Sequence, residues 1–162
     1  MSQLASAFGK DFAKHKDMVR TRTFVLGGHT FKVKVPLTSE FEAMQERMKS
    51  VDDERVEKYY KELTAGLERF RGEDAGDVKC EWLENDIVLD GRSMREAAKN
   101  KALVENRITE MFKMLVPEEK SFDMSEITYP MIDELFPFSI QMQVIDEITK
   151  TISPSYEATK GK

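Results

Sequence analysis

The side chains that most often act as catalysts near neutral pH are scarce in this sequence, which holds two histidines and one cysteine. Histidine is the usual general base, and a cysteine thiolate is a strong nucleophile. His15 lies in a weakly patterned segment, His29 follows a glycine pair typical of a turn, and Cys80 lies in an alternating apolar stretch typical of a core residue. A zinc site needs three or four such ligands at paired spacings. The sequence therefore predicts neither a catalytic residue nor a zinc ligand.

Three other patterns could hold a phosphate, a metal ion or a nucleic acid, and each has a simpler structural explanation. Gly27 and Gly28 join two predicted strands, whereas phosphate-binding loops join a strand to a helix. The acidic runs at 52–54 and 118–119 could bind Mg²⁺, but such residues on helix surfaces or at helix ends are usually solvated. The basic residues are not interleaved with aromatic residues that would stack on bases. We therefore predict no cofactor, no metal, no nucleic-acid partner and no enzymatic activity.

The composition is that of a folded protein. Its 162 residues are 40% hydrophobic and 34% charged, which is enough apolar surface for one core and too much for a disordered chain. A net charge of -5 gives no electrostatic reason to bind nucleic acid or an anionic membrane. No stretch is long and apolar enough for a membrane helix, and the first residues carry charges where a signal peptide would be apolar. Together with the single cysteine, these features predict a cytoplasmic protein without a membrane partner.

The first half of the chain predicts a β-hairpin followed by a long helix. In residues 23–35, Phe31, Val33 and Val35 alternate with Lys32 and Lys34, and the glycine pair before them is typical of a tight turn between two strands. Ser39 and Glu42 have the spacing of a capping box, which predicts a helix start. The apolar residues that follow keep a 3.6-residue period to about Arg71, which favours one helix, although a second helix could begin at Asp52 and Asp53.

The second half predicts a short extended region and three helices. Residues 78–89 fit an extended segment ending at a turn of Asp90 and Gly91, with a short helix as the alternative. Ser93 and Glu96 form a second capping box, which begins a helix that Pro117 ends. Pro130 permits a short helix over 131–136, and a last helix follows Pro137 with its buried stripe at Phe138, Met142, Ile145, Ile148 and Ile152.

These elements predict a mainly α fold with a minor β component. We expect a flexible N-terminal segment at 1–20, a single helical domain at 21–152 that includes the β-hairpin at 23–35, and a flexible C-terminal tail at 153–162. The ten methionines are consistent with helical core positions and also with an adaptable surface for other proteins. From helical periodicity we assign candidate partner-binding residues in the N-terminal segment and on the last helix: Phe8, Phe12, Met142, Ile145 and Ile148.

Four stretches together resemble the tail assembly chaperones of long-tailed bacteriophages: 24–38 (FVLGGHTFKVKVPLT), 86–95 (DIVLDGRSMR), 115–118 (LVPE) and 134–138 (ELFPF). The resemblance covers about 23–156 and includes no catalytic motif. It implies a non-virion protein of the infected host cell that binds the tape-measure protein and keeps it soluble until tail tube subunits polymerise around it. It also allows contact with the tail tube protein and self-association.

Two other functions fit the composition. One is a structural virion component, such as a tail completion or connector protein, which would co-purify stoichiometrically with finished particles. The other is an acidic inhibitor of a host defence nuclease that mimics DNA, and its acidic residues should cluster on one face without opposing bases. Lysine and arginine are instead interspersed with the acidic residues throughout the sequence, for example at 52–58, so the inhibitor ranks third.

Overall fold

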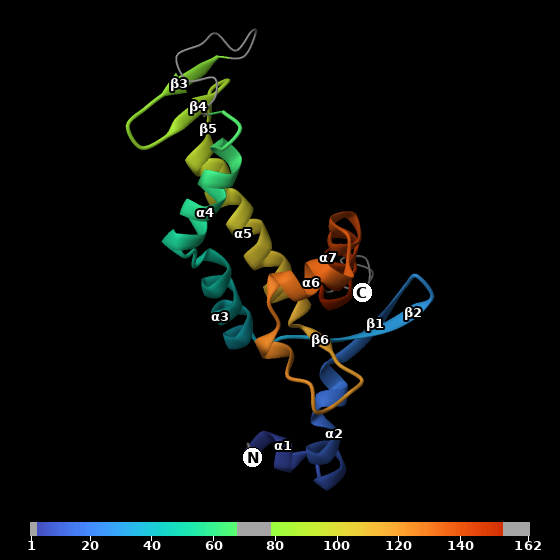
Figure 1. Ribbon diagram of the computed structural model, residues 1–162. Coiled ribbons are helices and arrows are strands. Elements are labelled where there is room, and N and C mark those ends of the chain that lie inside the picture. Colours follow the sequence, from blue (N-terminus) through green and yellow to red (C-terminus); the bar gives the residue numbers. More distant parts are fainter. Residues whose placement is uncertain (1–2, 68–78, 154–162) are drawn as a thin grey trace, which may run out of the picture. The chain divides into compact units, whose positions relative to one another are not determined.

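A computed structural model describes residues 3–67 and 79–153 and shows a mainly α fold with a minor β component, as predicted (Figure 1). The helices are α1 (Gln3–Ala7), α2 (Lys10–Arg20), α3 (Thr38–Lys49), α4 (Asp53–Thr64), α5 (Met94–Phe112), the short 3-10 helix η2 (Met124–Glu126), α6 (Tyr129–Leu135) and α7 (Phe138–Ile152). The strands are β1 (Thr21–Leu26), β2 (His29–Lys34), β3 (Cys80–Trp82), β4 (Ile87–Leu89), β5 (Arg92–Ser93) and β6 (Leu115–Val116).

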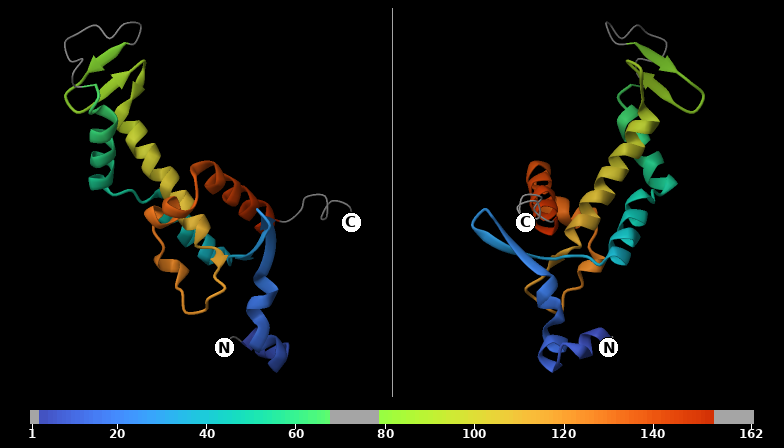
Figure 2. Two further views of the ribbon diagram at one scale, coloured as in Figure 1. Left: turned by 45° about the vertical axis from the view of Figure 1, so that its right-hand side comes forward. Right: turned by 180° about the vertical axis from the view of Figure 1, so that it is seen from behind.

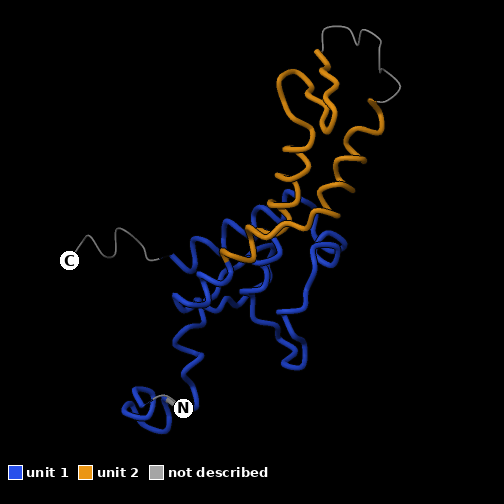
Figure 3. The backbone as a smooth tube through the Cα atoms, turned by 90° about the vertical axis from the view of Figure 1, so that its left-hand side faces the viewer, with its two compact units in different colours: residues 1–44, 108–162 blue, residues 45–107 orange. Residues whose placement is uncertain are grey.

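The chain divides into two compact units, coloured separately in Figure 3. Unit 1 contains residues 1–44 and 108–162, and unit 2 contains residues 45–107. The boundaries fall inside α3 and α5, so each of these helices contributes to both units. The single domain expected at 21–152 stays a prediction. The flexible tail expected at 153–162 lies, from 154 on, outside the described residues.

Unit 1 is built around the predicted hairpin, which the structure confirms. Gly27 and Gly28 have φ angles of 60° and 80°, the left-handed values that a two-residue turn between paired strands requires. β6 joins the other edge of β2 to give the antiparallel order β1-β2-β6. Helix α7 packs against β1 and β2, and both views of Figure 2 show it beside the hairpin.

The core of unit 1 combines one side chain from each hairpin strand with the apolar faces of the helices. Phe24 and Val33 are buried on the hairpin, and the Phe136 ring packs edge-on against the Phe112 ring with centroids 5.4 Å apart. Burial of such side chains supplies most of the free energy that holds a small unit together. The remaining buried apolar residues of unit 1 are Ala5, Met44, Ile108, Met111, Met114, Ile127, Ile132, Val144, Ile145 and Ile148.

The single long helix expected after residue 39 is wrong, and the alternative of a second helix beginning at Asp52 and Asp53 is confirmed. α3 ends at Lys49, and the Asn106 side-chain amide donates to the backbone carbonyls of Met48 and Ser50 at 3.3 and 2.7 Å. The Asp52 carboxylate then caps α4 by accepting from the backbone N–H of Glu54. A side chain distant in sequence therefore satisfies carbonyls that a continuous helix would have used itself. The expected helix end near 71 lies outside the described residues.

The start of α3 also differs from the prediction. The helix begins at Thr38, so Ser39 lies inside it, and the Glu40 carboxylate accepts from the backbone N–H of Leu37 at 2.8 Å. Glu40 also forms an ion pair with Arg20. The hydrogen bond from Leu37, helped by the charge of Arg20, lowers the pKa of the Glu40 carboxyl below its usual value. The cap is therefore made by a carboxylate reaching back from the first turn, the reciprocal half of a capping box.

In unit 2 the structure confirms extended structure in the described part of 78–89. Strands β3, β4 and β5 form an antiparallel sheet in that order, and Asp90 and Gly91, with φ angles of 51° and 80°, make the predicted turn. The predicted capping box is confirmed by a hydrogen bond from the Glu96 backbone N–H to the Ser93 hydroxyl at 3.1 Å. Val78 lies outside the described residues.

The helices of unit 2, α4 and α5, lie side by side in both views of Figure 2 and share a buried polar network. The Glu105 carboxylate, which is buried, accepts from the Arg55 guanidinium at 2.8 Å and from the Tyr59 hydroxyl. Burial, together with the hydrogen bond to Glu105, raises the pKa of Tyr59 above its usual value. Because a buried carboxylate is costly without partners, this network fixes the pairing of the two helices.

Candidate protein-binding surface

The structure separates the predicted partner-binding residues into exposed and buried ones. Phe8 is 64% exposed, and the centroid of its ring lies 5.2 Å from the ring centroid of Phe12, which is half-buried. Met142 is half-buried, but Ile145 and Ile148 are buried in unit 1, where α7 packs on the hairpin. These two residues are therefore core residues and offer no surface to a partner. Helical periodicity marked the inward face of α7, because the same spacing serves a core and a binding surface equally well.

A different set of apolar side chains is exposed where α6 meets α7. Met131, Leu135 and Phe138 are 44%, 73% and 55% exposed, and half-buried Met142 lies one helical turn beyond Phe138. We call these four residues the α6–α7 patch. The prediction that Phe138 belongs to the buried stripe of the last helix is wrong, and helical periodicity gives no indication of Leu135. Large apolar side chains exposed together, rather than singly, are typical of an interaction surface.

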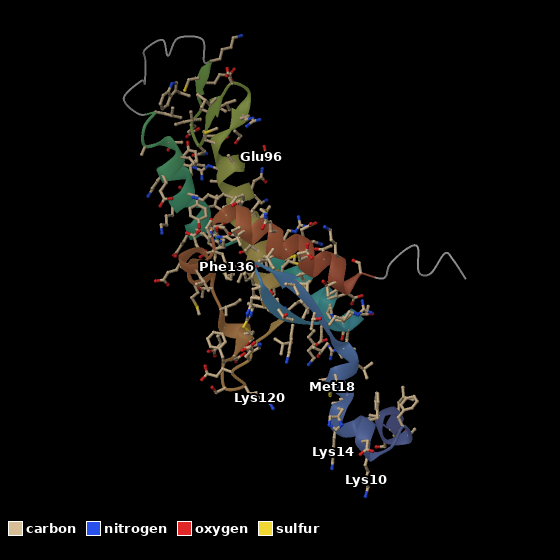
Figure 4. All side chains as sticks on the ribbon, turned by 90° about the vertical axis from the view of Figure 1, so that its right-hand side faces the viewer. Lys10, Lys14, Met18, Glu96, Lys120 and Phe136 are labelled. Carbon is tan, nitrogen blue, oxygen red and sulfur yellow. The ribbon has the colours of Figure 1, made fainter. Side chains whose placement is uncertain are left out.

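The corner that presents this patch is held by a fully buried polar side chain, Gln141. Its amide nitrogen donates to the carbonyl of Phe136 at 2.7 Å and to the carboxylate of Asp133 at 3.2 Å. Its amide oxygen accepts from the Tyr129 hydroxyl at 3.0 Å. Ile132, also on α6, is buried. Figure 4 labels Phe136, which with Pro137 connects the two helices. Apolar side chains are thus exposed on a corner whose polar groups are satisfied.

The charge around the patch is of one sign. Between Lys120 and Lys150 the sequence carries six acidic residues and no lysine, arginine or histidine. Asp133 and Glu134 border the patch on α6, and in the described part of the chain no cation forms an ion pair with either. Asp146 and Glu147, farther along α7, are balanced by Lys150. The patch is therefore an apolar surface bordered by two acidic side chains that form no ion pair within the described residues.

Comparisons of the chain with protein-family models, with curated proteins and with solved structures find no match.

The N-terminal helices carry the opposite combination of charge and apolar surface. Leu4 on α1, Phe8 directly after it, and Met18 and Val19 on α2 are exposed. Figure 4 shows Lys10, Lys14 and Met18 on α2. The backbone of α2 departs from helical geometry at His15, whose Nδ1 donates to the carbonyl of Asp11 at 2.9 Å. α2 is therefore a basic helix with a kink, not a continuous amphipathic rod.

A groove of about 920 Å³ lies in unit 2. Its charged walls include both signs, and the Arg95 guanidinium is already engaged, since it pairs with Glu57 and lies 4.1 Å from the centroid of the Tyr60 ring. Asp86 is likewise used to hold the start of α5, through the hydroxyl of Ser93. The apolar part of the groove is formed by Val51, Val56 and Leu103. The groove can accept an apolar side chain, and its charges stabilise the local fold.

The residues with catalytic potential do not assemble into a reactive cluster in the described residues. His29 is exposed at the start of β2, directly after the turn, with the centroid of its ring 4.6 Å from that of the Phe31 ring, and it lines a pocket of about 210 Å³. Cys80 is half-exposed on β3. In residues 3–67 and 79–153, no three His, Cys, Asp or Glu side chains gather as a metal-binding group. None of the helices in these two ranges is long and apolar enough to span a membrane.

Proposed function

We propose that this protein is a tail assembly chaperone of a long-tailed bacteriophage, which binds the tape-measure protein in the cytoplasm of the infected host. The observation that carries the proposal is the exposure of Leu135 and Phe138 on a corner fixed by Gln141. This corner lies in the stretch 134–138, one of the four that resemble the family. The function is binding, and we propose no catalytic step.

The physical task of such a chaperone is to cover apolar surface without consuming energy from a nucleotide. A tape-measure chain contains long helical segments whose apolar stripes would otherwise associate with one another. An exposed helical corner of this protein can bind such a stripe, because burying apolar area on both sides is favourable and reversible. Several copies along one client would then reinforce one another through a raised effective concentration. The net charge of -5 helps to keep the covered client dispersed.

Co-expression with the tape-measure protein encoded in the same genome tests the proposal. We expect the tape-measure protein to move from the insoluble to the soluble fraction and to co-elute with this chain in size-exclusion chromatography. Purified phage particles should lack the chain, which quantitative mass spectrometry would measure. A chain present in stoichiometric amount in finished particles would instead identify a structural virion component, and a client that stays insoluble and unbound would reject the chaperone.

A further inference from the structure

The α6–α7 patch has the spacing that suits one helix of a partner. Met131 and Leu135 are four residues apart on α6, and Phe138 and Met142 are four residues apart on α7. Each pair therefore forms one helical turn of apolar surface, and only Phe136 and Pro137 separate the two helices in the chain. A partner helix with apolar residues at every third or fourth position can lay its own stripe against such ridges.

The charge beside the patch determines which helix would bind best. Asp133 and Glu134 border the apolar side chains, and no basic residue occurs between Lys120 and Lys150. An acidic helix would bring like charges together as it docked, and an uncharged one would gain nothing from the carboxylates. A helix whose apolar stripe is bordered by lysine or arginine would gain both apolar burial and charge attraction.

We propose that the α6–α7 patch binds a basic amphipathic helix of the client, in which lysine or arginine borders a stripe of leucine, methionine or phenylalanine. This inference rests on the proposed function, because the client supplies the helix. A second copy of the chain is a poorer occupant. Its basic helix α2 is kinked at His15, between Lys14 and Met18, so it does not offer a continuous apolar stripe bordered by lysine.

Two synthetic helical peptides of about 20 residues test the charge preference directly. Both carry the same leucine stripe, which is bordered by lysine in one peptide and by glutamate in the other. Fluorescence anisotropy with the full chain should show the lysine peptide binding at least about tenfold more tightly, with the difference shrinking as salt rises from about 0.05 M to about 0.5 M.

Leu83 and Glu84, which are neighbours in unit 2, provide matched controls for Leu135 and Glu134 of the patch. Leu135→Ser should weaken binding of the lysine peptide about tenfold, because it removes the most exposed apolar contact of the patch. Glu134→Lys should weaken binding of the lysine peptide and strengthen binding of the glutamate peptide. Leu83 and Glu84 are also adjacent and exposed but lie outside the patch. Leu83→Ser and Glu84→Lys should therefore leave the affinities for the two peptides unchanged.

Three results would overturn the inference: equal binding of both peptides, equal losses from the Leu83 and Leu135 variants, or self-association that Leu135→Ser abolishes while neither peptide binds. The last result would identify a second copy as the occupant. The co-expression experiment separates this failure from failure of the proposed function. A tape-measure protein that stays soluble with both Leu135→Ser and Glu134→Lys would keep the chaperone and reject the patch.

Discussion

Gln141 shows how one buried polar residue can position an apolar surface. Its side chain connects Tyr129, Asp133 and the carbonyl of Phe136, so it ties the end of α6 to the first turn of α7. In residues 3–67 and 79–153 no buried side-chain nitrogen or oxygen lacks a hydrogen-bond partner. Any substitution that removes the amide leaves the Phe136 carbonyl without the hydrogen bond that it accepts from Gln141.

Replacing Gln141 by methionine, which has a similar shape, should therefore lower the free energy of unfolding by about 1–3 kcal/mol. Gln143→Met is the matched control, because Gln143 is exposed on the same helix and should change stability by less than about 0.5 kcal/mol. Urea denaturation followed by circular dichroism measures both. Equal stabilities of the two variants would show that the Gln141 hydrogen bonds contribute no net stability.

At the scale of elements, the sequence was sufficient wherever a local signal determined the structure. The glycine pair at 27–28, the turn of Asp90 and Gly91 and the cap at Ser93 each impose a backbone geometry within a few residues, and the structure confirms all three. The break between α3 and α4 also depends on Asn106, which lies more than 50 residues away in the sequence. Its side chain donates hydrogen bonds to backbone carbonyls at the end of α3. Periodicity alone could not show this contact.

The candidate site was harder to predict for a related reason. Apolar spacing identified the helices, but it could not separate the buried Ile145 and Ile148 from the exposed Leu135 and Phe138. That distinction depends on which face α7 turns towards the hairpin, a tertiary contact.

Asp86 joins two elements of unit 2, since its carboxylate accepts from the Ser93 hydroxyl and from the backbone N–H groups of Ile87 and Arg95. Partial burial on its own would raise the pKa of Asp86, but these hydrogen bonds outweigh burial, and the pKa is lowered below its usual value. A carboxyl group whose pKa is lower in the folded state than in the unfolded state stabilises the folded protein at pH values above the unfolded-state pKa. This contribution is lost as the pH falls through the folded-state value.

We therefore predict that Asp86→Asn lowers the free energy of unfolding by about 1 kcal/mol at neutral pH, the scale of hydrogen bonds at a solvent-accessible group. The difference from the parent protein should shrink as the pH falls below about 4, where the parent's own carboxylate becomes protonated. Denaturation at a series of pH values measures this, with the exposed Glu84→Gln as control. A difference that does not change with pH would reject the ionic contribution of Asp86.

At the scale of the whole molecule, charge is distributed unevenly along the sequence. Residues 1–44 contain seven lysines and arginines and four acidic residues, whereas all the charged residues in 121–149 are acidic. At neutral pH the net charge of -5 makes copies repel one another. The local attraction between basic and acidic segments of different copies is then opposed by the overall charge.

Lowering the pH changes this balance. Near pH 5.2 the net charge vanishes, while most aspartates and glutamates remain ionised because their usual pKa values lie near 4. Repulsion between copies is then lost, while the exposed apolar side chains of the α6–α7 patch stay available for contact. We predict reversible self-association that rises between about pH 7 and pH 5.2. Sedimentation velocity should show Leu135→Ser reducing this self-association more than Leu83→Ser does, because Leu135 belongs to the patch and Leu83 does not. Equal effects would mean that the association is not specific to the patch.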